Sequence, residues 1–373
     1  MATGDSPDSG RGILQGNPET GGSPVRPVLL SSTAEQLARF GPGLAAVGCA
    51  AGDVPALLQL AVAAGRSWPM PGEGRTAQLW ELLASVAAVD VAAARVFEPH
   101  LDAAAILKQA PAVADAGEGS WGVFAAEGPG LRLQATANGT GYVLNGSKPW
   151  CSLAGQLDHA VITAHTDDGG RAAFAVDLHH AGVRAEEPEW IARGLREIPS
   201  GTVHFDHVPA AAVGGSGWYH SRPGFAWGGM GVAACWLGGA VGVARDFRDG
   251  LRKGAETGRE PDQLALAALG ETDRILVSAL QYLARTAERV DAAGTAAGSS
   301  SDWSEAQRVR GTVASAVDRV LQLVTANRGP GPLAFDAAYA KRVADLALYV
   351  RQHHGHRDDA QLGSLTLKGD CPW

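Results

Sequence analysis

An indole and a hydroxyl group lie two residues apart near the middle of the chain, at Trp150 and Ser152. The dipeptide Asn145-Gly146 precedes them, and both of its residues tolerate the positive φ angles of a tight hairpin turn. The sequence therefore predicts a turn at this dipeptide and an extended segment after it. Side chains alternate along an extended chain, so the indole and the hydroxyl share one face. Such a pair can stack on a flat heterocycle and donate a hydrogen bond to its edge.

A helical stretch before these residues carries a second group of reactive side chains, Arg95, Glu98, His100 and Asp102. Glu98 or His100 has the chemistry of a general acid or base. The alternative is structural, because Arg95 and Glu98 lie three residues apart in a helix and can form an ion pair, with each other or with Asp90. The spacing favours the ion pair and leaves the acid–base role open.

A third group lies close to the C-terminus and contains three histidines and two aspartates. Imidazole titrates near neutral pH, so His353 or His354 could act as a catalytic base. Alternatively, these cations interact with the dipole of a helix that ends here, with Gly355 as its C-cap. A metal site is disfavoured because the spacing matches no recognised tetrahedral set.

Composition limits the classes of function. The chain has 373 residues, 46% of them hydrophobic, which is enough for two or three domains with proper cores. Its formal net charge is −8 and it has no basic run, so no nucleic-acid partner is predicted. Four widely spaced cysteines and the lack of a visible signal peptide predict free thiols and a cytoplasmic protein.

The order of elements predicts an α+β fold that is mostly α. Residues 1–27 are rich in Gly, Ser, Pro and Asp and predict a disordered tail. Residues 28–118 have helical periodicity and predict an N-terminal helical domain. Residues 119–216 contain short alternating apolar runs between turn signals and predict an antiparallel β domain. Residues 217–373 return to helical periodicity and predict a C-terminal four-helix bundle.

An uncharged run over residues 225–244 is long enough to cross a bilayer. No second span and no positively charged flank accompanies it. The run therefore favours the central helix of a packed bundle, buried on all sides, and no membrane association is predicted.

This order of elements, together with the segment Lys148-Pro149-Trp150-Cys151-Ser152, resembles the acyl-CoA dehydrogenase flavoprotein family over residues 30–363. In that family the corresponding strand reads G-x-K-x-W-I-T, its Trp packs on the isoalloxazine, and its Thr hydroxyl faces the N5 edge. The resemblance implies these roles for Trp150 and Ser152. Residues 121–127 are similar to the family's strand ending in T-E-P. The matching positions against the pyrimidine side of the flavin are Val123, Ala125 and Ala126.

The resemblance implies an FAD-dependent oxidoreductase that acts on the CH–CH group of an acyl-CoA thioester. It also implies an electron-transfer flavoprotein as partner and a homodimer or homotetramer. The sequence departs from the family at three places. The loop after Glu127 is short, and Arg259 is the one match to the R-x-x-F-G signature. The usual catalytic Glu is absent, and Asp336, the carboxylate nearest its place, is expected to cap a helix.

His353 and His354 are therefore the candidate catalytic residues. Two further interpretations follow from the missing Glu. One is a flavin monooxygenase-like member of the fold, which needs no base for an α-proton. The other is a flavin-free scaffold or binding subunit.

Overall fold

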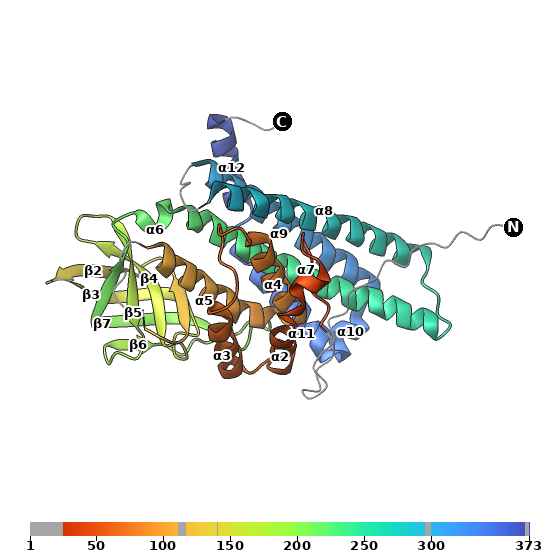
Figure 1. The fold of residues 1–373 in the computed structure, drawn as a ribbon. Coiled ribbons are helices and arrows are strands. Elements are labelled where there is room, and N and C mark those ends of the chain that lie inside the picture. Colours follow the sequence, from red (N-terminus) through yellow and green to blue (C-terminus); the bar gives the residue numbers. More distant parts are fainter. Residues whose placement is uncertain (1–24, 111–116, 140, 295–299, 370–372) are drawn as a thin grey trace.

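The computed structural model describes residues 25–110, 117–139, 141–294, 300–369 and 373. Helices come first, a sheet follows, and long helices complete the chain (Figure 1). This arrangement confirms the predicted mostly helical α+β fold with a middle β domain. Nearly all of the predicted tail lies outside the described residues.

The N-terminal helices cover one side of the central helix of the protein. They are α1 (Ala34–Ala38), α2 (Gly41–Cys49), α3 (Val54–Gly65), α4 (Thr76–Val89) and α5 (Val91–Gln109). The carboxylate of Asp90 accepts a hydrogen bond from the backbone N–H of Ala93 (2.7 Å), so α5 begins directly after α4 in a new direction. This cap points the polar residues of α5 toward the sheet.

The sheet contains seven strands in the described part of the chain. They are β1 (Trp121–Phe124), β2 (Leu133–Asn138), β3 (Gly141–Ser152), β4 (His159–Thr166), β5 (Arg171–Asp177), β6 (Val183–Ala185) and β7 (Ser200–Val213). Most pairings are antiparallel, as predicted, with the long β3 and β7 at the centre. β1 and the start of β2 pair with β4 in parallel. β1 is an edge strand, so one side of its backbone is free of sheet hydrogen bonds.

The predicted turn at Asn145-Gly146 is wrong. The dipeptide lies inside β3, where the register with β7 shifts between Leu144 and Gly146. Gly146 has φ 115°, and a Cβ there would lie 2.2 Å from the carbonyl oxygen of Arg132. A glycine with positive φ serves a β-bulge as well as a turn, and here it bends a continuous strand. β2 and β3 instead pair from Leu133 and Gly146 to Asn138 and Gly141.

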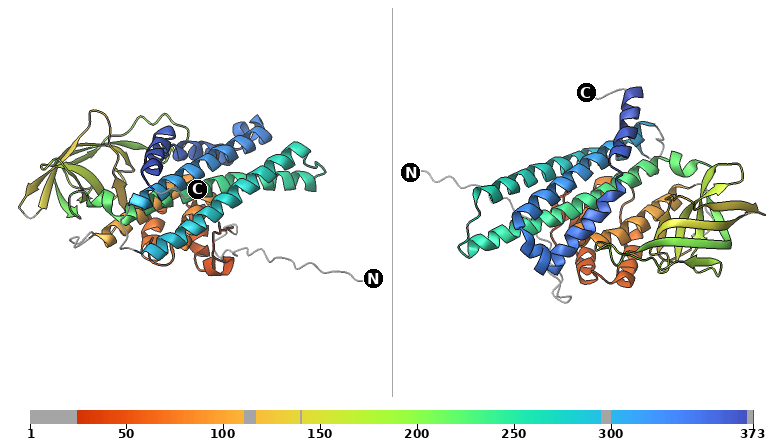
Figure 2. Two further views of the ribbon diagram at one scale, coloured as in Figure 1. Left: turned by 90° about the horizontal axis from the view of Figure 1, so that it is seen from above. Right: turned by 180° about the vertical axis from the view of Figure 1, so that it is seen from behind.

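The helices after the sheet form the long axis of the molecule. They are α6 (Trp218–Ser221), α7 (Pro223–Glu256), α8 (Gln263–Ala293), α9 (Ser300–Arg328), α10 (Pro330–Phe335), α11 (Ala337–Tyr349), the 3-10 helix η1 (Val350–Gln352) and α12 (His356–Lys368). α7, α8 and α9 run side by side (Figure 2), and α11 packs on α7 to complete the bundle. A Cβ at Gly238 of α7 would lie 2.1 Å from the carbonyl oxygen of Ala84, so this glycine permits close approach to α4.

α7 alone among the described helices is long and apolar enough to cross a membrane. Of its most apolar stretch, 83% is buried inside the protein. This burial supports the prediction of a central core helix.

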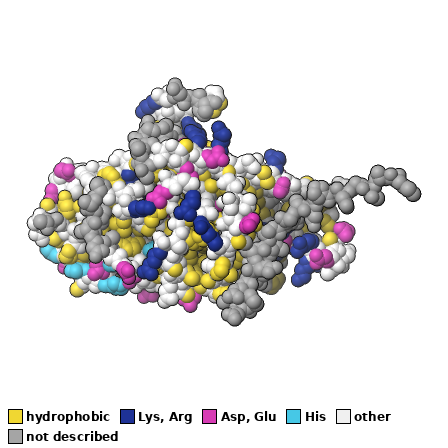
Figure 3. Space-filling view, in the orientation of Figure 1, with side chains coloured by type: hydrophobic (Ala, Val, Ile, Leu, Met, Phe, Trp, Pro, Cys, Tyr) yellow, Lys and Arg dark blue, Asp and Glu magenta, His cyan; other side chains and the backbone are white. Residues whose placement is uncertain are grey.

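Lys and Arg side chains are interspersed with Asp and Glu on the face shown in Figure 3.

The end of the chain differs from the expectation of a terminal helix reaching His354. α11 begins at its N-cap Asp336, which accepts from the Tyr339 N–H (3.0 Å), as predicted. The helix stops at Tyr349, and Gly355, with φ 57°, precedes a further helix, α12. Gly355 is therefore the N-cap of α12 and not the C-cap of the preceding helix. Cys49, Cys151 and Cys235 are free thiols, as predicted, and Cys371 lies outside the described residues.

Candidate functional site

A cavity of about 770 Å³ lies where the sheet meets the helices. Its walls come from α5, from β1 and the residues after it, from the end of β3, and from residues 195–200. Further wall residues come from α9 and η1. The residues singled out from the sequence that line it are Arg95, Glu98, Asp102, Val123, Ala125, Ala126, Trp150, Ser152 and His354.

Trp150 and Ser152 both line this cavity, at a second shift in register between β3 and β7. The Trp150 side chain is large and apolar, yet 63% of the residue is exposed. The Ser152 hydroxyl lies 2.6 Å from the Ser200 hydroxyl and accepts a hydrogen bond from the Arg95 guanidinium (3.0 Å). An exposed indole beside an anchored hydroxyl is an arrangement suited to a flat ring.

Backbone strain is concentrated at the cavity. Four non-glycine residues in the described chain have positive φ: Trp150 (60°), Leu153 (58°), Leu195 (52°) and His207 (52°). The first three line the cavity. Each such conformation costs about 1–3 kcal/mol and persists where the surrounding structure enforces it. The surrounding structure therefore holds three strained residues in the cavity wall.

The free edge of β1 contributes backbone to the same wall. Val123, Ala125 and Ala126 line the cavity. The Ala125 carbonyl accepts from the Arg171 guanidinium (3.3 Å), and the carboxylate of Glu127 pairs with the buried ammonium of Lys148 (2.6 Å). These bonds fix the segment after β1 while its unpaired backbone groups stay available to a ligand.

Glu98 is the most perturbed acid in the cavity wall. The side chain is nearly buried, and burial raises the pKa of Glu98 from 4.5 to about 7, although the Arg95 guanidinium (3.5 Å) acts in the opposite direction. Asp102, one turn further along α5, also has a raised pKa because of burial, with Arg222 3.7 Å away. The predicted ion pair is present, and the same carboxyl group also has a pKa suited to proton transfer near neutral pH.

His100 has a structural position. Its Nδ1 accepts a hydrogen bond from the Trp121 backbone N–H (3.2 Å), which joins α5 to β1. Burial lowers the pKa of His100 to about 4, so the ring is neutral at physiological pH.

The two candidate histidines have different surroundings. His354 lines the cavity with 66% of its side chain exposed, and its Nδ1 lies 3.3 Å from the Asp358 carboxylate. The side chain of His353 is only 10% exposed and lies behind the cavity wall, beside Gly311. Burial lowers the pKa of His353. His354 is therefore the better placed of the two to meet a ligand, and a catalytic role for either stays a prediction.

Arg259 lies in the exposed connection between α7 and α8, at the opposite end of the molecule from the sheet (Figure 1). Within one chain it does not line the cavity, so a role in cofactor binding requires another copy of the chain.

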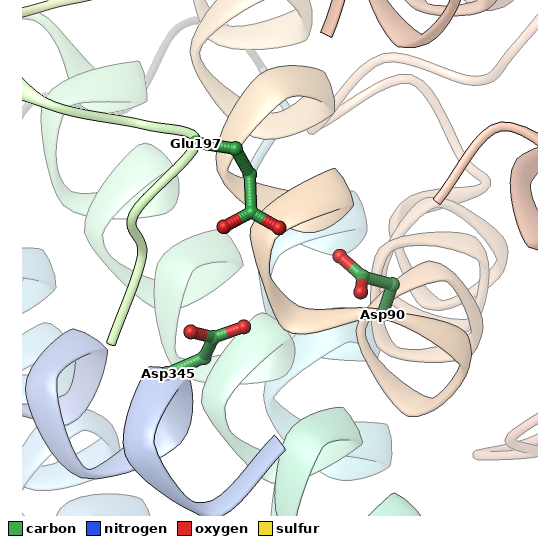
Figure 4. Close-up of side chains that lie close together, drawn as sticks. All are labelled: Asp90, Glu197 and Asp345. Carbon is green, nitrogen blue, oxygen red and sulfur yellow. The ribbon is translucent and has the colours of Figure 1, made fainter. Parts of the chain in front are cut away.

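A cluster with the appearance of a metal site lies beside the cavity. Asp90, Glu197 and Asp345 converge from three separate segments (Figure 4). The ammonium of Lys341 lies 2.9, 2.8 and 2.6 Å from these carboxylates, in that order. Asp345 also accepts a hydrogen bond from the Leu195 backbone N–H (2.6 Å). The cluster is therefore an ion-pair network centred on lysine, and it holds the strained Leu195 in the cavity wall.

Comparison with known proteins agrees with this architecture. Residues 125–208 match the family model described as acyl-CoA dehydrogenase, middle domain. This middle part of the chain is therefore similar to the middle domain of the acyl-CoA dehydrogenases. No curated protein sequence matches it.

Several solved structures share the fold of this chain. XiaF from Streptomyces sp., in complex with FADH2 and glycerol, has a TM-score of 0.70 at 20% identity, covering 91% of this chain and 96% of XiaF. Dibenzothiophene monooxygenase (TdsC) from Paenibacillus sp. A11-2 has a TM-score of 0.66 at 17% identity, covering 88% of this chain and 98% of TdsC. Butyryl-CoA dehydrogenase from Megasphaera elsdenii has a TM-score of 0.69 at 16% identity, covering 84% of this chain and 89% of that enzyme. At these identities the similarity shows the shared fold and leaves the reaction open.

Sequence reasoning did not single out Arg310 as a site residue. It lies on α9, lines the cavity, and donates hydrogen bonds to the carbonyls of Gly229 on α7 (3.1 Å) and of Gln352 in the cavity wall (2.8 Å). In sequence it follows Val309, part of an apolar helical stripe, and an arginine beside such a stripe is normally a solvated residue. The pattern therefore carried no signal of its role.

Proposed function

We propose that this protein is a flavin-dependent monooxygenase that acts on a small polar molecule. The observation that carries the proposal is the ionisable wall of the cavity, where Arg95, Glu98 and Asp102 of α5 lie beside the flat surface offered by Trp150. Cavities of about 300–1,000 Å³ are typical of small-molecule sites, and this one has room for a flavin ring and a second small molecule.

The residues present fit a flavin ring. Trp150 offers an exposed aromatic face, Ser152 a hydroxyl, and the free edge of β1 its backbone groups at Val123, Ala125 and Ala126. When bound, the flavin would supply oxidation–reduction chemistry. FAD is the flavin that the family resemblance implies, and FMN has the same ring. The related XiaF structure contains FADH2, and a TdsC structure contains FMN and indole.

Side chains of this protein would accept and release the proton of a bound molecule. Glu98, with its pKa near 7, can accept a proton from a bound molecule and release it again at neutral pH. Arg95 contacts both the Glu98 carboxylate and the Ser152 hydroxyl, and so fixes the distance between the acid–base group and the sheet. His354, at the exposed end of the cavity, is a second candidate for proton exchange with solvent.

An acyl thioester is the second candidate substrate, and Glu98 itself favours it. Dehydrogenation of an acyl-CoA needs a carboxylate base, and Glu98 would supply the one missing near Asp336. Electrons would then pass to an electron-transfer flavoprotein. Against this candidate, an apolar acyl chain packed on Glu98, Asp102 and Arg310 would remove water from charged groups without replacing their hydrogen bonds.

Flavin binding is the first test. The purified protein is titrated with FAD and with FMN, and the quenching of flavin fluorescence gives the affinity. We expect Trp150→Ala to weaken binding about tenfold or more, which corresponds to about 1.4 kcal/mol of lost stacking. Trp373→Ala, which removes a 93% exposed indole at the end of the chain, is the matched control and leaves the affinity unchanged. Uptake of neither flavin would establish the flavin-free scaffold.

The reaction type is the second test. Flavin-loaded protein is mixed with butyryl-CoA under anaerobic conditions, and we expect the flavin absorbance to stay constant. Bleaching would establish dehydrogenation and refute the monooxygenase. Size-exclusion chromatography with light scattering tests the homodimer or homotetramer that the resemblance implies.

A further inference from the structure

A second chamber of about 390 Å³ opens from the main cavity. Glu98, Asp102, Arg310 and His354 line both spaces, so the two meet at these side chains. The rest of the inner chamber is formed by α6, the first turns of α7, α9 and α12. Glu98 therefore lies where the chamber meets the main cavity.

Aromatic side chains form one side of the inner chamber. The rings of Phe225 and Trp303 are stacked, with centroids 5.1 Å apart and an interplanar angle of 28°. Tyr219 contacts Phe225 edge to face, at 5.5 Å and 69°. Aromatic faces and edges of this kind attract another planar ring by about 0.5–1.5 kcal/mol for each pair, beyond the burial of area.

The other side of the chamber has charged groups of both signs. The guanidinium of Arg222 has only 2% of its side chain exposed and donates to Gln109 (2.9 Å), and its Nε has no hydrogen-bond partner among the described residues. The carboxylates of Glu98 and Asp102 accept hydrogen bonds when ionised. A ligand must therefore both donate and accept, which a hydroxyl group does with a single atom.

We propose that the inner chamber binds a planar aromatic molecule with a ring hydroxyl, oriented so that its O–H donates to Glu98. This inference rests on the proposed flavin-dependent function and names the class of its substrate. The proton moves from the hydroxyl oxygen to a carboxylate oxygen of Glu98, and the electron pair of the broken O–H bond stays on the ring oxygen. The aromatic ring becomes electron-rich at the boundary with the main cavity, which is the state that favours oxygenation of a ring carbon.

Gly229 of α7 lines the chamber. A Cβ at Gly229 would meet only the Arg310 side chain, at 3.5 Å and beyond, so a larger side chain there extends into the chamber without a backbone clash. Gly250 lies on the same helix, is exposed, and has open space around it. Gly229→Leu therefore fills the chamber, and Gly250→Leu is its matched control.

The test measures binding of 2-naphthol by isothermal titration calorimetry, to protein with and without saturating flavin. Decahydro-2-naphthol has the same carbon skeleton and hydroxyl but lacks the planar aromatic rings. We expect 2-naphthol to bind at least tenfold more tightly than its saturated analogue. Gly229→Leu should lower this affinity at least tenfold and leave the flavin affinity unchanged, while Gly250→Leu changes neither. Glu98→Gln should remove the rise in 2-naphthol affinity that the wild type shows as the pH increases through about 7.

Three results would overturn the inference: equal binding of the saturated analogue, unaltered 2-naphthol affinity in Gly229→Leu, or displacement of 2-naphthol by butyryl-CoA. Failure of the wild type to bind flavin would overturn the proposed function instead. The two failures are distinguishable because the chamber is built from protein side chains, so 2-naphthol binding is measured in the flavin-free protein as well.

Discussion

Replacement of Glu98 by glutamine keeps the shape of the side chain and removes its ionisation. The pKa of this carboxyl group is raised by burial from 4.5 to about 7. Between these two values the folded protein keeps a proton that the unfolded chain has released, so the free energy of unfolding falls as the pH rises. The raised pKa of Glu98 lowers the free energy of unfolding by about 3 kcal/mol at pH 8 and by about 1 kcal/mol at pH 5.

Glu98→Gln should therefore be stabilised relative to the wild type by about 2.5 kcal/mol more at pH 8 than at pH 5. Urea denaturation followed by tryptophan fluorescence at the two pH values measures this difference. Glu118→Gln, at a side chain that is 95% exposed, is the control and should show almost no dependence on pH. A Glu98→Gln effect of equal size at both pH values would refute the perturbed pKa, and with it the acid–base role.

Two further substitutions test the packing around the cavity. Gly146→Ala places a methyl group against the Arg132 carbonyl at a positive φ and should lower the free energy of unfolding by about 3 kcal/mol, whereas Gly270→Ala, in open space on α8, should change it by less than about 1 kcal/mol. Equal effects would contradict the bulge in β3. Lys341→Met leaves three carboxylates without their shared cation and should lower the free energy of unfolding by about 2–3 kcal/mol. This is less than the roughly 3–5 kcal/mol lost when a fully buried ion pair is broken, because 34% of the Lys341 side chain is exposed. Thermal unfolding of this variant with a Tm equal to that of the wild type would show that the cluster does not stabilise the fold.

Local patterns predicted the order of elements and the surface around Trp150 because both depend on residues close together in sequence. Alternation alone placed Trp150 and Ser152 together, although the structure reaches that result through a shift in register. The same local logic failed at Asn145-Gly146, since a positive φ is equally suited to a bulge and a turn.

The proposed acid–base residue, Glu98, could not be assigned from sequence. The spacing of Arg95 and Glu98 predicts an ion pair, and the ion pair is present. Whether that pair faces solvent or a cavity depends on the position of α5 against β1, which contacts between residues far apart in sequence decide. The pKa of Glu98 is a product of that burial. For the same reason no single segment of the sequence predicts the inner chamber, whose aromatic residues lie at positions 219, 225 and 303.

The network around Lys341 also bears on how the chain assembles. Its carboxylates come from the α4–α5 junction, the segment before β7, and α11, which are the helical domain, the β domain and the final bundle (Figure 4). The ammonium of Lys341 contacts all three carboxylates only when the three parts have docked in their native positions. The ion pairs of Lys341 therefore stabilise the arrangement in which the three parts are docked and the cavity wall is complete.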